Sequence, residues 1–211
     1  MSTSTTRRDF LKNAGILATA AAAAQMAPAV HAASDNTIQL ALIGCGGRGS
    51  GAVGDALTAA GGTVAPGPVK LVAMADVFAD RLAGSHKNLS EAFGDNISVP
   101  KDRQFVGFDA YKKAIDCLKP GDIALCTTHA AFRPMHFEYA VSKGVNVFME
   151  KSFAVDSPAV RRMMKAAAEA DKKNLKVSVG FMWRHSKARQ EVIKRIHDGA
   201  IGDVNLLRIY R

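Results

Sequence analysis

Short apolar runs alternate along the chain with segments of helical periodicity. The runs predict strands over residues 38–43, 69–75, 104–106, 122–126, 145–149 and 176–180. The intervening periodic segments predict helices over residues 52–60, 80–89, 109–118, 134–143, 157–173 and 187–198. Strands that are apolar throughout and separated by helices are typical of a parallel sheet buried on both faces. The pattern therefore predicts an α/β protein with a doubly wound parallel sheet.

Turn residues set several of the predicted boundaries. Gly144 follows a helical segment, where a residue with positive φ commonly ends a helix. Ser157 precedes Pro158, which predicts a helix with Ser157 as its N-cap and the proline in its first turn. Residues 61–68, rich in glycine and proline, are expected to form a surface loop.

The first predicted strand runs directly into a glycine-rich turn of the form G-x-G-x-x-G. In this turn Gly44 permits a tight bend, Gly46 lets the backbone approach phosphates, and Gly49 allows close helix–strand packing. A helix N-terminus that follows such a turn offers free N–H groups and a positive dipole end to an anion. Residues Gly44, Gly46, Gly47, Arg48 and Gly49 are therefore predicted to bind a dinucleotide, within a Rossmann-type sheet.

An acidic residue, Asp76, stands at the carboxyl end of the second predicted strand. At this position an acid accepts hydrogen bonds from the ribose hydroxyls of NAD and disfavours the 2′-phosphate of NADP. Arg48 and Arg81 lie close enough in sequence to keep NADP possible. An alternative is that Asp76 caps the next helix, and both roles are compatible.

Polar residues also follow the fourth and fifth predicted strands, at the same edge of the sheet. Thr127 and Thr128 are candidates to contact the nicotinamide ribose, although a hydrogen-bonded turn would use the same residues. Lys151 is a candidate to donate to a substrate oxygen, with Glu150 fixing its position. Alone, such a pair is most often a solvated surface feature.

Taken together, the glycine loop, the acid, the threonines and the Glu–Lys pair resemble the Gfo/Idh/MocA oxidoreductases, which include glucose–fructose oxidoreductase and inositol dehydrogenase. The chain is also similar to this family over residues 107–111, 132–136 and 199–203. The resemblance spans nearly the whole chain after the N-terminal segment. It implies hydride transfer between NAD, with NADP possible, and a sugar or polyol substrate.

The same resemblance assigns roles to individual residues. It implies that Lys151 polarises the reacting oxygen and is catalytic, and that Thr127, Thr128, Glu150 and Lys151 lie at the cofactor. Arg184 is expected to reach cofactor or substrate. The family's Glu–Lys–Pro appears here with Ser152 in place of the proline, which removes the proline's constraint on a turn that is often cis.

Family members continue for well over a hundred further residues as an α/β substrate domain. By this comparison residues 33–180 are the nucleotide-binding domain, and residues 181–211 begin an incomplete C-terminal domain. Residues 203–211 alternate like its first strand, and His185 is expected to be a polar turn residue. The missing part would carry the catalytic base, most substrate contacts and the interface of a homo-oligomer.

Two other functions remain open. The first is an NAD-dependent glycoside hydrolase or lyase of the same superfamily, in which a transient oxidation is followed by elimination. The second is a nucleotide-binding fragment without turnover.

The N-terminus resembles a twin-arginine (Tat) export signal over residues 1–32. Arg7 and Arg8 precede an apolar Phe10–Leu11 pair, an alanine-rich stretch and a small-residue cleavage site. The alternative, a membrane-spanning helix, is disfavoured because the apolar stretch is short. The signal implies passage through the Tat translocon to the periplasm as a folded protein, with its cofactor loaded before export.

Charge and cysteine content narrow the remaining classes. The 211 residues carry a formal net charge of +9, but the basic residues are mixed with acids on predicted helices and are not interleaved with aromatics. This pattern favours solvated helix faces over a nucleic-acid partner. Cys45, Cys117 and Cys126 have neither disulfide nor metal spacing, so no metal site is expected.

Overall fold

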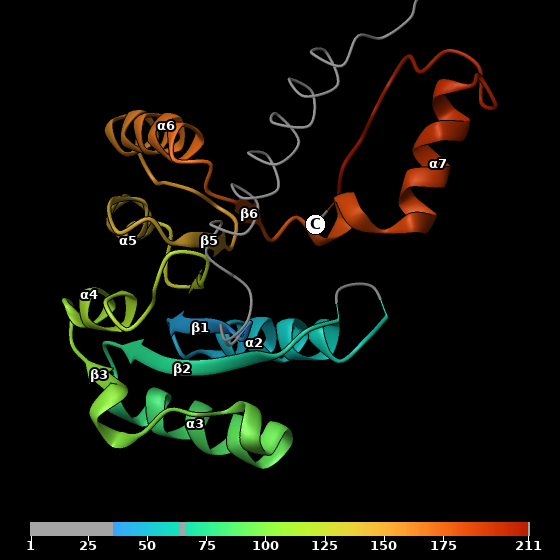
Figure 1. Cartoon of the computed structure of the whole chain (residues 1–211). Helices are drawn as coiled ribbons and strands as arrows, with labels where there is room; N and C mark the ends of the chain where they lie inside the picture. Colours follow the sequence, from blue (N-terminus) through green and yellow to red (C-terminus); the bar gives the residue numbers. More distant parts are fainter. Residues whose placement is uncertain (1–35, 64–65, 211) are drawn as a thin grey trace, which may run out of the picture. The chain divides into compact units, whose positions relative to one another are not determined.

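A computed structural model describes residues 36–63 and 66–210. In this part of the chain six strands form one sheet: β1 (Ile38–Ile43), β2 (Val69–Asp76), β3 (Gln104–Val106), β4 (Ile123–Cys126), β5 (Asn146–Met149) and β6 (Val177–Val179). Neighbouring strands are parallel, in the order β3-β2-β1-β4-β5-β6 (Figure 1). This is the strand order of the Rossmann fold, and it confirms the predicted fold class.

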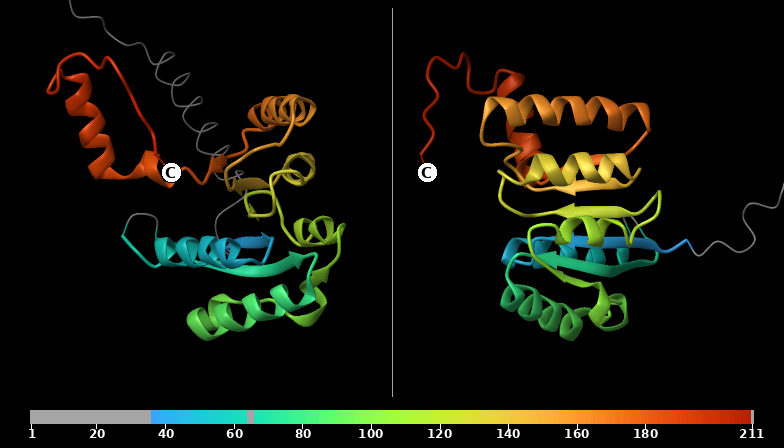
Figure 2. Two further views of the ribbon diagram at one scale, coloured as in Figure 1. Left: turned by 180° about the vertical axis from the view of Figure 1, so that it is seen from behind. Right: turned by 90° about the vertical axis from the view of Figure 1, so that its left-hand side faces the viewer.

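Five helices connect the described strands, and a sixth, α7, follows the last of them. They are α2 (Gly47–Ala60), α3 (Ala79–Phe93), α4 (Ala110–Ile115), α5 (Arg133–Ser142), α6 (Ser157–Lys172) and α7 (Lys187–His197). Because successive strand residues point to opposite faces, each face has its own buried cluster. One cluster joins the strands to α2 and α3, and the other joins them to α4, α5 and α6 (Figure 2). Helices therefore lie on both faces of the sheet, and on the side of α2 and α3 residues of β4, β5 and β6 line a pocket.

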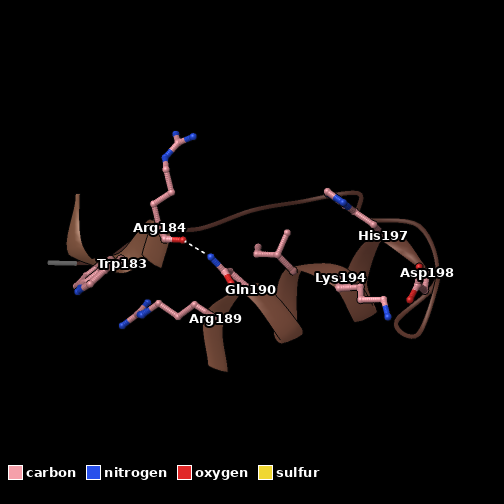
Figure 3. A pocket seen from close by; sticks show the side chains of 8 residues that line it. Trp183, Arg184, Arg189, Gln190, Lys194, His197 and Asp198 are labelled. Atoms are coloured by element: carbon pink, nitrogen blue, oxygen red, sulfur yellow. Dashed lines mark hydrogen bonds between the residues drawn. The ribbon is translucent and has the colours of Figure 1, made fainter. Parts of the chain in front are cut away.

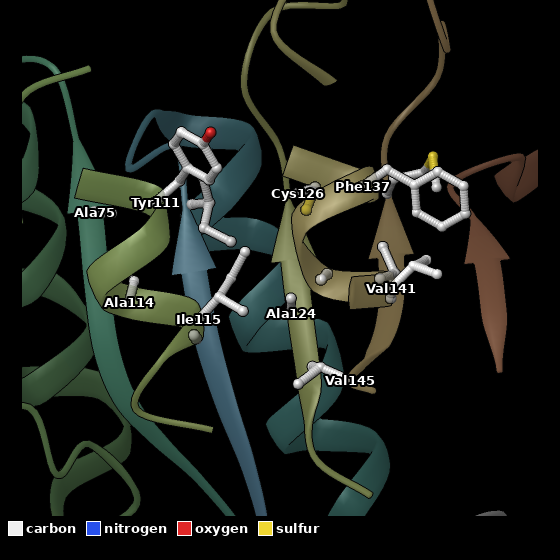
Figure 4. Packing of buried hydrophobic residues seen from close by; sticks show 14 of the residues in the cluster. Ala75, Tyr111, Ala114, Ile115, Ala124, Cys126, Phe137, Val141 and Val145 are labelled. Carbon is white, nitrogen blue, oxygen red and sulfur yellow. The ribbon is translucent and has the colours of Figure 1, made fainter. Parts of the chain in front are cut away.

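Small residues on the strands let the helices of the second cluster pack closely. Ala75 of β2 and Ala124 of β4 belong to this cluster, together with Ile115 of α4 and Phe137 of α5 (Figure 4). Both large side chains are almost completely buried. Burial of each contributes about 2 kcal/mol to stability, so this face anchors the strand ends that carry the site.

Two local predictions are wrong. The N-cap of α6 is Asp156 and not Ser157, because the Asp156 carboxylate accepts a 2.7 Å hydrogen bond from the backbone N–H of Ala159. Residues 203–210 form no strand, since none of the described strands pairs with them, and they are exposed. The predicted export signal lies outside the described residues.

Candidate functional site

The carboxyl ends of β1 and β4 mark the point where the strand order reverses. The two strands pair directly, yet the helices that follow them lie in different clusters on opposite faces of the sheet. In folds of this type, ligands bind beside the carboxyl ends of the strands at such a point. Residues 44–49, called the glycine loop below, follow β1 at this edge of the sheet.

Two glycines of the loop lie where no side chain fits. Gly44 has φ +101°, and a Cβ on it would lie 2.8 Å from the backbone nitrogen of Thr128. A Cβ on Gly49 would lie 2.0 Å from the carbonyl oxygen of Gly44 and 2.7 Å from Oγ1 of Thr127. The loop after β1 and the turn after β4 are therefore in direct contact.

The other two glycines face open space. A Cβ on Gly47 would meet no atom within 4 Å, and one on Gly46 would meet only a guanidinium nitrogen of Arg81, at 3.9 Å. No side chain caps the N-terminus of α2, and its first turn holds no acidic residue. The N–H groups that a helix start leaves unpaired are thus available to an anion.

Asp76 ties the end of β2 to the glycine loop. Its Oδ2 accepts a 2.6 Å hydrogen bond from the backbone N–H of Cys45, and its Oδ1 accepts one of 2.9 Å from that of Phe78. The N-cap of α3 is Phe78, so the alternative role of Asp76 as a helix cap is wrong: its carboxylate closes the turn before the helix. Asp76, which the sequence predicts to bind the ribose, therefore also holds the glycine loop in place through this hydrogen bond.

The two threonines after β4 point to different partners. The Thr127 hydroxyl donates to the carbonyl of Gly44 at 2.7 Å, which fixes the first glycine from the β4 side. Thr128 Oγ1 lies 3.1 Å from Nδ1 of His136, a buried residue on α5 stacked against Tyr111. Burial, with the nearby positive charge of Arg133, lowers the pKa of His136 to about 4, so the imidazole is neutral at physiological pH.

A buried arginine joins the turns after β4 and β5. The Arg133 guanidinium donates to the carbonyls of Thr128, Glu150 and Ser152, the second of these at 2.5 Å. Its Nε is buried without a hydrogen-bond partner among the described residues. The contacted carbonyls lie on both sides of Lys151, and the peptide bond between Lys151 and Ser152 is cis even though serine replaces the expected proline.

The Glu–Lys pair does not interact in the expected way. The Glu150 carboxylate pairs with Arg48 of the glycine loop, with 2.7 Å between Nε and Oε1. Lys151 is exposed, and its ammonium makes no hydrogen bond or ion pair with any described residue. Glu150 therefore does not fix the lysine, because its charge is directed at the guanidinium of Arg48.

Arg184 does not join this group of residues. It lies in a short 3-10 helix, Met182–His185, and lines a separate pocket of about 670 Å³ with residues of α7. Figure 3 shows its carbonyl accepting a hydrogen bond of 2.8 Å from Gln190, while the Arg184 guanidinium points away from α7. Beside it, Arg189 lies over the ring of Trp183.

The described residues contain neither a reactive thiol nor a cluster of metal-binding side chains. Burial raises the pKa of Cys45 and of Cys126 to about 12, so both thiols stay protonated. Residues 36–63 and 66–210 contain no group of three or more side chains suited to hold a metal ion. None of the helices described there is long and apolar enough to cross a bilayer.

Sequence reasoning gave no role to three residues that shape the site: Arg133, His136 and Gly180. Arg133 and His136 fall in a segment that resembles the family, but the sequence does not indicate that an arginine at a helix start is buried. Gly180 follows β6, and a Cβ there would lie 2.7 Å from both carboxylate oxygens of Glu150. Such a contact depends on two strand ends meeting, which no local pattern reveals.

Comparison with known proteins gives matches only at the level of structure. No family model matches the chain. No curated protein matches it either. Similar solved structures include myo-inositol 2-dehydrogenase from Lactobacillus plantarum, with 23% identity and a TM-score of 0.63 over 80% of this chain and 43% of that one.

Two further structures show the same fold. Scyllo-inositol dehydrogenase from Lactobacillus casei has 20% identity and a TM-score of 0.56, over 81% of this chain and 44% of that one. A 3-ketoreductase from Actinomadura kijaniata, in complex with NADP, has 23% identity and a TM-score of 0.57, over 80% of this chain and 46% of that one. The matches thus span less than half the length of each of these proteins.

Proposed function

We propose that the chain binds a nicotinamide dinucleotide at the glycine loop, and that the protein transfers a hydride between this cofactor and a sugar or polyol. The observation that carries the proposal is the hydrogen bonding around the loop. Asp76 holds Cys45 from the end of β2, and Thr127 holds Gly44 from the end of β4. Both contacts fix the loop at the sheet edge where the strand order reverses, which is where folds of this type bind their ligands.

The residues present fit a dinucleotide. The open space at Gly46 and Gly47 lets a pyrophosphate approach the backbone, and the uncapped start of α2 supplies N–H donors without an opposing acid. Asp76 would accept hydrogen bonds from a ribose, which supports NAD. Arg81 stacks over Phe78 beside the loop, so its charge keeps NADP in the proposal.

Lys151 is the proposed catalytic residue. When bound, the nicotinamide supplies the site that accepts or gives the hydride. Lys151 would donate a hydrogen bond to the reacting oxygen of the substrate and so polarise it, while a base outside the described residues would handle the proton. The turn that carries Lys151 is fastened on both sides by Arg133, so the amine starts from a fixed backbone.

The similar structures support the substrate class. Two of them are inositol dehydrogenases and one is a 3-ketoreductase in complex with NADP. We extend the proposal to three features that the family resemblance implies: export through the Tat translocon to the periplasm, a C-terminal substrate domain that begins near residue 181, and a homo-oligomer. Arg184 would belong to that substrate domain.

A deuterium-transfer assay tests the proposal. The chain is incubated with NAD and a panel of polyols deuterated at the reacting carbons, and the nicotinamide product and sugar products are analysed by mass spectrometry. Hydride transfer predicts deuterated NADH and one ketone per NADH. An elimination product without net NADH would indicate the glycoside hydrolase or lyase chemistry instead, and binding without either product would indicate a nucleotide-binding fragment without turnover.

A further inference from the structure

An ion pair connects the glycine loop to the turn after β5. Arg48, the second residue of α2, donates from Nε to Oε1 of Glu150 across 2.7 Å. The Glu150 side chain is 8% exposed and that of Arg48 is 45% exposed. A buried carboxylate thus holds a half-exposed guanidinium at the start of α2.

The carboxylate has little freedom to move. A Cβ on Gly180 would lie 2.7 Å from each of its oxygens, so the backbone after β6 packs directly against it. The Gly180 N–H donates to the carbonyl of Met149, which keeps the ends of β5 and β6 together. Glu150 is therefore a fixed acceptor for Arg48.

Only one of the five N–H donors of Arg48 is used in this contact. Its Nη atoms make no hydrogen bond with any residue that the structure describes. The Arg133 guanidinium donates to the backbone carbonyl of Glu150, so Arg48 alone pairs with the carboxylate among the described residues. The free Nη donors of Arg48 are thus available to an anion, and a guanidinium matches phosphate oxygens in shape.

We propose that Arg48 is a side-chain ligand of the dinucleotide's pyrophosphate, and that Glu150 is the positioning residue that aims it. Glu150 then acts on the cofactor phosphates and not on Lys151, and Gly180 is required because it leaves room for the carboxylate. The inference rests on the proposed dinucleotide binding. It adds a contact from the side chain of Arg48 to those from the backbone of the loop.

Calorimetric titration of the full chain with ADP and with adenosine separates a phosphate contact from every other effect. Arg48→Lys is expected to weaken ADP binding about tenfold and to leave adenosine binding within about twofold. Glu150→Gln is expected to weaken ADP binding about fivefold, again sparing adenosine, and Gly180→Ala should repeat this effect by displacing the carboxylate. Arg162→Lys, at an exposed ion pair on α6, is the matched control and should change neither titration.

A double variant tests the positioning role. If Glu150 acts through Arg48, adding Glu150→Gln to Arg48→Lys costs no further ADP affinity, whereas independent roles would multiply the two losses.

Equal losses for ADP and adenosine, multiplied losses in the double variant, or unchanged ADP affinity in Arg48→Lys would each overturn the inference. Because Arg48 is at the surface, Arg48→Lys is expected to fold, so it tests the phosphate contact even where a Glu150 variant fails to fold. A wild-type chain that binds neither ADP nor NADH overturns the proposed function and this inference together, while wild-type binding that the variants leave unchanged overturns only the inference.

Discussion

Oδ2 of Asp76 accepts a 2.6 Å hydrogen bond from the backbone N–H of Cys45, a residue 31 positions earlier in the chain. The contact joins the end of β2 to the glycine loop after β1. The other carboxylate oxygen of Asp76, Oδ1, accepts a hydrogen bond from the backbone N–H of Phe78 in the following turn. A single carboxylate therefore shapes the loop and also stands where a ribose is expected.

Asp76→Asn tests this double role. Asparagine keeps one acceptor oxygen and presents an amide NH₂ to the other N–H, so we expect a loss of about 2 kcal/mol in the free energy of unfolding. NADH affinity should fall at least about tenfold, since both the loop and the ribose contact are affected. Urea unfolding and calorimetry measure the two effects. Asp80→Asn, an exposed acid in the first turn of α3, is the control and should cost less than about 0.5 kcal/mol.

Two glycines in α2 give opposite predictions for the same substitution. Gly49→Ala would place a Cβ 2.0 Å from the Gly44 carbonyl oxygen, so it should destabilise the chain by about 3 kcal/mol or more and abolish NADH binding. Gly51→Ala meets no atom within 4 Å and should stabilise the helix by about 1 kcal/mol. Thermal unfolding checks both. Equal effects of the two variants would show that the loop is not packed as described.

The parallel sheet and most element boundaries could be predicted from the sequence because buried parallel strands are apolar throughout. The run at 38–43, followed by the glycine loop, gave both the first strand and its helix. At the start of α6, Asp156 and Ser157 are both good N-caps, and local sequence did not show which side chain reaches the free N–H. For residues 203–210, alternation alone predicted a strand, but a strand also needs a partner to pair with.

The candidate site was predictable only where it follows strand ends. Topology brings all carboxyl ends to one edge, so Asp76, Thr127 and Lys151 were found from position. The partners of the side chains were not predictable: Glu150 lies next to Lys151 in sequence, yet it pairs with Arg48, 102 residues away. Contacts of this kind depend on how strands and loops meet in three dimensions.

The buried His136 predicts a pH dependence of stability. Its pKa is about 4 in the folded chain, against about 6.5 when unfolded. Between these values the unfolded state binds more protons, so stability falls as the pH is lowered from about 6.5 to 4, by up to about 3 kcal/mol. Urea unfolding at several pH values measures the slope. His136→Gln removes this titration, so the loss of stability between pH 6.5 and 4 should shrink by up to about 3 kcal/mol. An unchanged pH dependence in this variant would contradict the lowered pKa of His136.

Arg133→Lys tests the connection between the turns after β4 and β5. Lysine keeps the charge but cannot donate to three separate carbonyls from a planar group, so we expect a loss of about 3 kcal/mol in the free energy of unfolding. Arg162→Lys, which changes an exposed ion pair with Glu138, should cost less than about 1 kcal/mol. Similar losses in the two variants would indicate that Arg133 contributes no more than a surface arginine.

The central claim is that the glycine loop and the start of α2 hold a dinucleotide pyrophosphate, and Gly47→Asp tests it most directly. Gly47 is exposed and a Cβ there meets no atom within 4 Å, so an aspartate fits without strain, and a negative charge at a helix start favours the fold. Calorimetric titration with NADH should show one site in the wild-type chain, and at least about tenfold weaker binding in Gly47→Asp at an unchanged or higher melting temperature. Absence of NADH binding to the wild type, or equal binding by the variant, would contradict the claim.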